Sequence, residues 1–593
     1  MKLQRMISAK IFFSLILLTI ILWLLSIIYT PIIDEVLPAD PLFFAKNLSV
    51  FYWLSLAMLL VLLLLRVAIP TKKRIYRLLD IFLICCLVLI IYGTPCLVYN
   101  LPVYVDTYIH TSTSLKILLR GHIPPPLSMM GASNNPGAYF FFSIFMLTTN
   151  LDSLIFMRYY PILRSSVMLL SLYVVSLKFA SSKFAVLAPF VYTAFNYFRF
   201  HVYPGGLSHF FYLLFILFFL FLVERNKKEF KLLTLIIVST ATITYILAPP
   251  LLLLSSLLPF IPLLWKMKAQ RNFIVPIIIF VVWASWLIYV SQGSFTYITS
   301  WLRKALTESI AVSLPTQVVS LPSVRIISLL MKQAITVFAI SAGILTTLLC
   351  LINIKENLER QKALIIGGNF IVCCLALFAS LAFVPEASTR FYSFLLIPYS
   401  LLIPVYISAK QDSDGSNLRK LKRIVTCALL VSTIVFLSIT PIVRNDNDPG
   451  FYYPSSSLKG AEFAVDYLMG NIMWVRNHVH LIEYAASKKG ILLEGYMGLQ
   501  QNDNVSFISI SRYIGLPPEL GLFHPVEGTF LSYFSKEAVR HCDAMIFNSY
   551  EDAMMIMAGE ERYSKMRVLY EMYVSEVMNK VYSSGSIRIY YRV

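Results

Sequence analysis

Long apolar runs recur along this 593-residue chain from its N-terminus to Val443. A run of about 18 or more residues with few charges is long enough to cross a bilayer as a helix. Hydrophobic residues make up 58% of the chain and charged residues 14%, so lipid is the solvent for most of it. The chain therefore has to fold as an all-α polytopic membrane protein, because backbone polar groups in lipid must be satisfied within each helix.

The hydropathy pattern predicts about 13 spans, near 11–30, 48–67, 79–98, 161–178, 184–200, 209–223, 231–247, 249–265, 273–291, 334–354, 363–384, 391–408 and 425–443. Basic clusters around Arg74, Lys227 and Lys420 then fall on one side. The positive-inside rule makes that side the cytoplasm. We expect a multi-pass plasma-membrane protein with its N-terminus inside and its C-terminal part outside.

The formal net charge of +19 does not indicate nucleic-acid binding, because the basic residues lie in short clusters between apolar runs, where charge sets topology. Seven of the eight cysteines lie in or beside these runs. They form neither a disulfide framework nor a zinc motif.

The composition changes to mixed and polar after Arg444, so we divide the chain into a membrane domain, residues 1–443, and an extracytoplasmic α/β domain, residues 444–593. No recognised catalytic motif occurs in the second domain. Its pattern predicts helices at 458–468 and 551–569 and strands at 490–494, 505–510, 544–547 and 586–590.

The first long outer loop, residues 99–160, contains the apolar segment Tyr139–Leu147. A full crossing here would invert all later loops and place the basic clusters outside. We therefore expect a short re-entrant or interfacial helix. Loops of this length with their own helices tend to be functional.

Asp106 stands in this loop, before a stretch that predicts an amphipathic helix ending at Gly121. One interpretation is that Asp106 only caps this helix. The other is that its carboxylate, in a partly dry cleft, takes a proton from a hydroxyl nucleophile. His110, four residues on, would share its helix face and could orient it or relay a proton.

A second candidate lies where Glu386 and Arg390 precede a late span. Arg390 could snorkel or pair with Glu386, or its guanidinium could hold a lipid phosphate bidentately. Arg303, on the loop after Ser291, is expected to anchor the chain at the interface or to cover a lipid head group. His201 or His209 could complete a metal site, although the loop of Asp106 has only one carboxylate.

These features resemble the GT-C membrane glycosyltransferases, which use polyprenyl-phosphate or polyprenyl-diphosphate sugars. Val105–His110 stands where that family has its first-loop catalytic acid. Asn135 and Pro136 stand where it has the second juxtamembrane helix, and Arg390 looks like its late-loop arginine that meets donor phosphate. The second outer loop has no acid where metal-dependent members place one. This departure favours metal-independent members with Asp106 as the base, and a divalent metal (Mg²⁺ or Mn²⁺) is the open alternative.

The resemblance implies an inverting glycosyltransferase that carries a sugar from a polyprenyl (dolichyl) phosphate donor. The acceptor would be a lipid-linked glycan, a glycolipid or a protein at the outer membrane face. It assigns catalysis to Asp106 and His110, and substrate binding to Arg390, Glu386, His201 and Arg303. Two other classes stay open. One is an exporter or flippase of lipid-linked glycan or polymer, and the other is a membrane scaffold whose outer domain binds a partner.

Overall fold

A computed structural model gives the structure of residues 9–34, 42–69, 74–104, 106–123, 134–198, 200–225, 227–258, 274–292, 294–296, 298–299, 303, 323–353, 357–383, 385–409, 416–445, 455–467, 470–474, 479–489, 505–509, 544–548, 575, 579–584 and 587–591.

The membrane domain consists of helices. In chain order these are α2 (Ala9–Tyr29), α3 (Phe43–Asn47), α4 (Val50–Ala68), α5 (Arg74–Val88), the π-helix η1 (Leu89–Gly93), α6 (Thr94–Val98), α7 (Asp106–Arg120), α8 (Gly137–Thr149), α9 (Ser153–Phe179), α10 (Ser182–Ala185), α11 (Leu187–Phe195), α12 (Pro204–Arg225), α13 (Lys228–Thr244), α14 (Ala248–Leu257), α15 (Ile274–Tyr289), α17 (Ser323–Asn353), α18 (Asn357–Phe383), α19 (Pro385–Ser408) and α20 (Ser416–Arg444).

Within the described part of the chain, 9 helical segments are long and apolar enough to cross a membrane: α2, α4, α5 to α6, α9, α12, α17, α18, α19 and α20. The other predicted spans coincide with the shorter helices α10 to α11, α13, α14 and α15. The polytopic helical class is therefore confirmed, whereas the count of about 13 spans stays a prediction.

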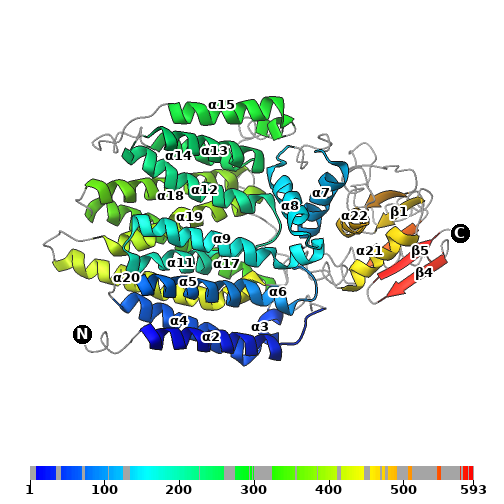
Figure 1. The fold of residues 1–593 in the computed structure, drawn as a ribbon, viewed down its shortest axis with the longest axis horizontal. Coiled ribbons are helices and arrows are strands. Elements are labelled where there is room, and N and C mark those ends of the chain that lie inside the picture. Colours follow the sequence, from blue (N-terminus) through cyan, green and yellow to red (C-terminus); the bar gives the residue numbers. More distant parts are fainter. Residues whose placement is uncertain are drawn as a thin grey trace.

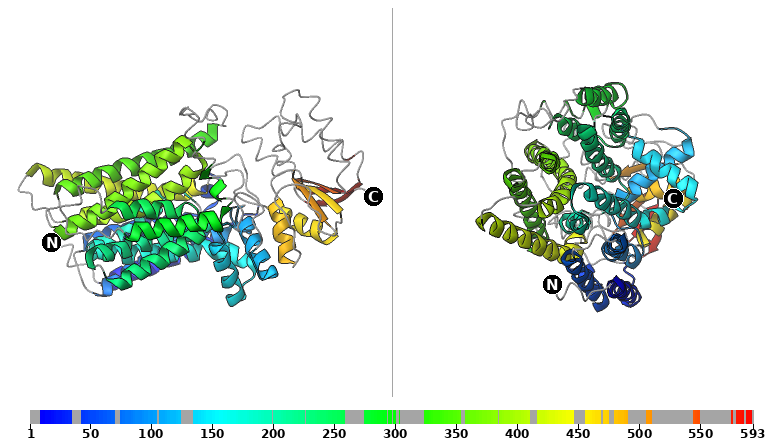
Figure 2. Two further views of the ribbon diagram at one scale, coloured as in Figure 1. Left: turned by 90° about the horizontal axis from the view of Figure 1, so that it is seen from above. Right: turned by 60° about the vertical axis from the view of Figure 1, so that its left-hand side comes forward.

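The spans form one bundle, and α2 and α20 both begin at the same end of it (Figure 1). The opposite end carries α7, α8 and the C-terminal elements, which project away from the bundle in both further views (Figure 2). α8 lies across that end beside α7 and exposes Phe140, Ile144 and Leu147. Of the two expectations for this segment, this placement favours an interfacial helix, because an exposed apolar face at a bundle end suits the membrane surface.

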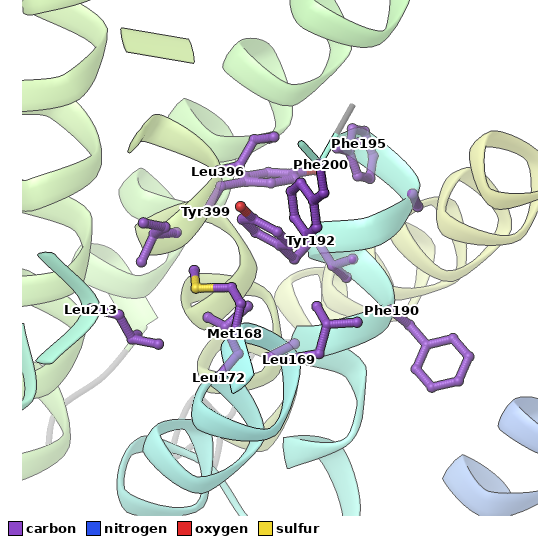
Figure 3. Packing of buried hydrophobic residues seen from close by; sticks show 14 of the residues in the cluster. Met168, Leu169, Leu172, Phe190, Tyr192, Phe195, Phe200, Leu213, Leu396 and Tyr399 are labelled. Carbon is purple, nitrogen blue, oxygen red and sulfur yellow. The ribbon is translucent and has the colours of Figure 1, made fainter. Parts of the chain in front are cut away.

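The core of the bundle is built where α9, α11, α12 and α19 meet. Figure 3 shows side chains from these helices and from the segment after α11 in one buried cluster. Phe195 of α11 packs edge-on against Tyr399 of α19, with ring centroids 5.0 Å apart. Among the described spans α19 is the most enclosed, since 94% of its apolar membrane-spanning stretch is buried inside the molecule. Arg390 lies near the start of α19, where Thr389 and Arg390 are exposed, so it stands at the edge of this enclosed stretch.

A buried ion pair joins the first helices to this core. Arg66 of α4 donates through Nε to Asp80 Oδ1 at 2.5 Å and through Nη2 to Asp80 Oδ2 at 3.0 Å, and Tyr173 of α9 donates to the same carboxylate at 2.9 Å. The relative exposure of the two charged side chains is 1% and 0%. Such a pair tolerates burial only with good geometry and further hydrogen bonds. The bidentate contact and the Tyr173 hydroxyl supply these, while Arg66 Nη1 is buried without a hydrogen-bond partner.

The C-terminal part contains a five-stranded sheet in the order β2-β1-β3-β5-β4. Its elements are α21 (Ser455–Tyr467), β1 (Gly470–Trp474), α22 (Val479–Lys488), β2 (Val505–Ser509), β3 (Ala544–Asn548), β4 (Asn579–Ser584) and β5 (Ile587–Tyr591). β1 pairs in parallel with β2 and β3, whereas β5 runs antiparallel to β3 and β4. Three predicted strands and the helix at 458–468 match β2, β3, β5 and α21. The predicted strand 490–494 and helix 551–569 lie outside the described residues.

The C-terminal part docks on the outer helices through α22. Tyr484 is fully buried, meets Tyr108 of α7 edge-on at 5.4 Å, and shares a 2.9 Å hydrogen bond with the Ser153 hydroxyl of α9. On the other side of the junction, the Asp34 carboxylate accepts from Ser455 Oγ at 2.6 Å and from the Ser455 amide at 3.2 Å. α7 is thus held between the bundle and the C-terminal part (Figure 1).

Replacing Asp80 by Asn should destabilise the protein by about 3–5 kcal/mol, because it leaves the buried Arg66 guanidinium without its charge partner. Unfolding in detergent, followed by circular dichroism, measures this loss. The double variant Arg66→Met, Asp80→Leu should recover much of it. The exposed pair Lys489–Asp466 is the control, and Lys489→Ala should cost only about 0–1 kcal/mol. An Asp80→Asn protein as stable as the parent would contradict the assignment.

The Asp34 link should make docking of the C-terminal part depend on pH. Burial alone would raise the pKa of Asp34, but hydrogen bonds from Ser455 and Asn100 hold that pKa below its ordinary value. The ionised carboxylate therefore stabilises docking above the unfolded pKa of about 3.9, and the stabilisation is lost as pH falls through the lower folded value. Limited proteolysis at pH values from about 3 to about 6, a range that brackets the unfolded pKa, should show cleavage rising toward the acid end. Asp34→Asn should be more susceptible at pH 6 and should lose most of the pH dependence; an unchanged profile would exclude the link.

Candidate functional site

Asp106 and His110 lie one turn apart on α7, which begins at Asp106 and ends at Arg120, directly before Gly121. Gly121 has φ 69°, and its amide donates to the Ile117 carbonyl at 2.9 Å, which is the helix stop that the sequence predicts. Asp106 is half-buried. Just before it, Tyr104 has φ 89° and its carbonyl accepts from the Thr107 amide at 3.1 Å. A bulky residue in this left-handed region is strained, so the surrounding structure must fix the start of α7.

α8 supports α7 and contributes Tyr139. The Tyr139 hydroxyl lies 3.0 Å from His110 Nδ1, and Ser143 Oγ of α8 donates to the Ser114 carbonyl of α7 at 2.8 Å. The start of α8 is anchored to the bundle in turn, because Asn135 donates to the Thr242 carbonyl at 3.0 Å. His110 is therefore fixed from both sides, by its own helix and by α8.

The second outer segment, between α11 and α12, brings aromatic rings to the same place. His201 lies against Tyr104 with ring centroids 4.2 Å apart and stacks on Tyr203 at 5.1 Å. Tyr203 in turn lies 6.3 Å from the His110 ring. The structure thus joins His201, a predicted binding residue, to the helix of Asp106.

Arg390 completes the group from the first turns of α19. Its side chain is exposed and interacts electrostatically with Tyr245, Tyr203 and Asp106. Segments far apart in the sequence therefore bring a carboxylate and a guanidinium within electrostatic range of each other, at the end of the bundle that carries α7 and α8. Glu386 opens the same helix one turn earlier, and its side chain lies outside the described residues.

The other residues predicted to contribute to the site are Arg303 and His209. Arg303 is exposed, in a stretch of which the structure describes only scattered positions, so its binding role stays a prediction. His209 is buried within α12 rather than at the loop surface. No group of three or more His, Cys, Asp or Glu side chains lies together in the described ranges. The groups around Asp106 that could coordinate a metal ion are one carboxylate, imidazoles and phenols. This set differs from the cage of oxygen ligands that Mg²⁺ prefers.

Sequence reasoning missed Tyr139, Tyr203, Tyr245 and Arg164 as members of this region. The three tyrosines carry no motif, and only the fold brings them to His110 and Arg390. Arg164 did carry a signal, because an ionisable residue inside a predicted span marks a functional site by default. It lies in α9 with its Cζ 5.6 Å from the Tyr203 ring centroid.

Comparison with protein-family models finds no match, and comparison with curated proteins finds none either. Among solved structures, the archaeal oligosaccharyltransferase AglB from Archaeoglobus fulgidus, in complex with an inhibitory peptide and a dolichol-phosphate, is similar. It has 9% sequence identity and a TM-score of 0.50, over 82% of this chain and 72% of that one. The arabinofuranosyltransferase AftD from Mycobacteria has 10% identity and a TM-score of 0.44, over 88% of this chain and 40% of that one, so this chain spans less than half of AftD.

At this level of identity the similarity to AglB concerns the fold. It confirms the architecture that the outer-loop residues suggested, and it leaves the roles of Asp106, His110, Arg390, Glu386, His201 and Arg303 as predictions. The chain has the GT-C membrane fold.

Proposed function

We propose that the protein is an integral-membrane glycosyltransferase that moves a sugar from a polyprenyl-phosphate donor to an acceptor at the outer face of the plasma membrane. The observation that carries the proposal is the electrostatic interaction between Asp106 and Arg390 at one end of a GT-C bundle. AglB, which has this fold, is solved with a lipid phosphate and a peptide. The proposal carries that pairing of a lipid-phosphate donor with an outer acceptor over to this chain.

Arg390 holds the donor phosphate. A guanidinium presents N–H groups in a planar fork that fits phosphate oxygens, and the exposed side chain at the start of a buried span is accessible to a head group. The lipid tail then lies along the bundle, in the bilayer where it already resides. Because Arg390 also interacts with Asp106, phosphate bound there lies beside the carboxylate.

Asp106 is the general base. As the acceptor oxygen attacks the anomeric carbon, its proton passes to the Asp106 carboxylate, and the bond from that carbon to the phosphate oxygen breaks. The phosphate leaves with the bonding electron pair, which Arg390 stabilises. One displacement inverts the anomeric configuration.

His110 and His201 contact the sugar and position the base. The Tyr104, His201 and Tyr203 rings form a continuous aromatic surface beside α7, to which the apolar face of a sugar ring can bind. The acceptor is a lipid-linked glycan, a glycolipid or a protein. It approaches from the outer side, where α22 of the C-terminal part packs on α7.

Replacing Asp106 by Asn should reduce sugar transfer from a polyprenyl-phosphate sugar by about 10²–10⁴-fold, because the amide cannot accept the proton. Transfer to acceptor in detergent measures the rate, and binding of the lipid phosphate should persist. Asp466→Asn, an exposed position on α21, is the matched control and should keep full activity. Full transfer by a folded Asp106→Asn protein would exclude the base role. Label crossing sealed vesicles without transfer would identify an exporter.

The proposed orientation has its own test. In a cysteine-free background, a membrane-impermeant thiol reagent applied to intact cells should label a cysteine at His122 but not one at Lys10. Both positions are exposed, and they lie at the end of α7 and the start of α2. Lys10→Cys should react once the cells are permeabilised. Labelling of both positions in intact cells would contradict the orientation.

A further inference from the structure

Arg164 is a cation buried in a membrane span. Arg164 is only 9% exposed to solvent, and in the described part of the chain no carboxylate forms an ion pair with it. Nη2 lies 3.3 Å from Nδ1 of His209, whereas Nη1 is buried with no hydrogen-bond partner. A buried charge of this kind is costly. Its retention therefore needs an explanation beyond packing.

The hydrogen-bond roles around Arg164 show what kind of partner is missing. Arginine can only donate, so His209 Nδ1 accepts from it. A neutral imidazole that accepts at Nδ1 carries its proton on Nε2. His209 Nε2 is also buried without a partner. Arg164 Nη1 and His209 Nε2 are thus both unfilled donors, and the group that would satisfy them is an acceptor.

The N-terminus of α12 lies directly against this guanidinium. A Cβ on Gly206 would lie 2.6 Å from Arg164 Cζ and 3.0 Å from Nη1, and a Cβ on Gly205 would lie 1.7 Å from the Tyr203 hydroxyl. Both glycines are therefore required by the close approach of these side chains. The first amides of a long helix have no intrahelical partner and attract negative charge. In α12 the Gly206 amide donates to the Tyr203 carbonyl at 3.1 Å, so the helix contributes mainly through its dipole. α12 has 22 residues, long enough for a full dipole.

Arg164 and His209 lie next to the proposed active site, on the side of the helix bundle. Tyr203 contacts both sides, since its ring centroid is 5.6 Å from Arg164 Cζ and it interacts with Arg390. His209 packs on Phe394, which is one turn along α19 from Arg390, with centroids 4.5 Å apart. Tyr203 is half-buried.

We infer that Arg164, His209 and the first turn of α12 form a second oxyanion subsite, distinct from Arg390, that binds a phosphate group of the lipid donor. The unfilled donors supply the hydrogen bonds, and the guanidinium and helix N-terminus supply the charge. The inference rests on the proposed function. A lipid diphosphate would fill this subsite with the phosphate that Arg390 does not hold, whereas the single phosphate of a lipid monophosphate would be shared between Arg390 and this subsite.

Binding of farnesyl phosphate, farnesyl diphosphate and farnesol to the full chain in detergent tests the subsite, with affinity read from ligand-induced shifts in Tm. Arg164→Gln should weaken binding of a phosphate-bearing lipid by about 10- to 100-fold, the loss expected for charge-assisted hydrogen bonds. Farnesol binding should not change. Weakening for the diphosphate alone would assign the subsite to a second phosphate, and weakening for both lipids would assign it to the single phosphate.

Gly206→Ala tests the same subsite with Arg164 in place, since its methyl group displaces the guanidinium. It should weaken phosphate-lipid binding in the same direction. Gly93→Ala, whose Cβ would meet only ordinary contacts from 3.6 Å, is the matched control and should bind as the parent does. Parental affinity for both phosphate lipids in folded Arg164→Gln and Gly206→Ala proteins, with loss in Arg390→Gln, would overturn the subsite alone. A parent protein that moves no sugar from a polyprenyl-phosphate sugar, while its binding of phosphate lipids still depends on Arg164, would instead overturn the proposed function alone.

Discussion

The packing of α7 between the bundle and α22 is the contact on which the candidate site depends. α7 is short and half polar, and a helix of this length is marginal by itself in water. Its position comes from Tyr484, which meets Tyr108 and Ser153, and from α8, which binds it through Ser143. Because Asp106 is the first residue of α7, these contacts set the distance from the carboxylate to Arg390.

Cations buried in the membrane domain are each held in a different way. Arg66 has a carboxylate, Asp80. Arg444, at the outer end of α20, donates to the carbonyls of Thr193 and Asn196 and lies with Cζ 4.5 Å over the Tyr92 ring. Arg164 has an imidazole and an aromatic face, with Cζ 4.2 Å over Phe200. The first two arrangements join helices. Arg164 instead lies beside Tyr203 of the candidate site and next to a second buried donor without a partner, His209 Nε2, which is why we assign it a ligand.

The sequence alone predicted the membrane class and the helix that begins at Asp106 and stops before Gly121, because apolar length and turn chemistry are local signals. The GT-C fold was predicted from the resemblance of the Asp106, Pro136 and Arg390 stretches to that family. The sequence also proposed that Asp106 and Arg390 face the same side. It could not find Tyr139, Tyr203 or Tyr245, since their roles come from contacts between distant segments. In the C-terminal part it missed β1, whose short run from Gly470 has little β-branched character, and α22, which is stabilised by its contact with α7.

The contact between Tyr484 and Ser153 joins residues 331 positions apart, and that between Asp34 and Ser455 joins residues 421 apart. During synthesis α7 emerges long before α22 exists, and loop closure over such separations comes late in folding. The helix that carries Asp106 therefore gains its final support only when the last part of the chain has been made and has docked. Maturation of the C-terminal part thus acts as a checkpoint, so that an incomplete chain carries the residues of the site without their working arrangement.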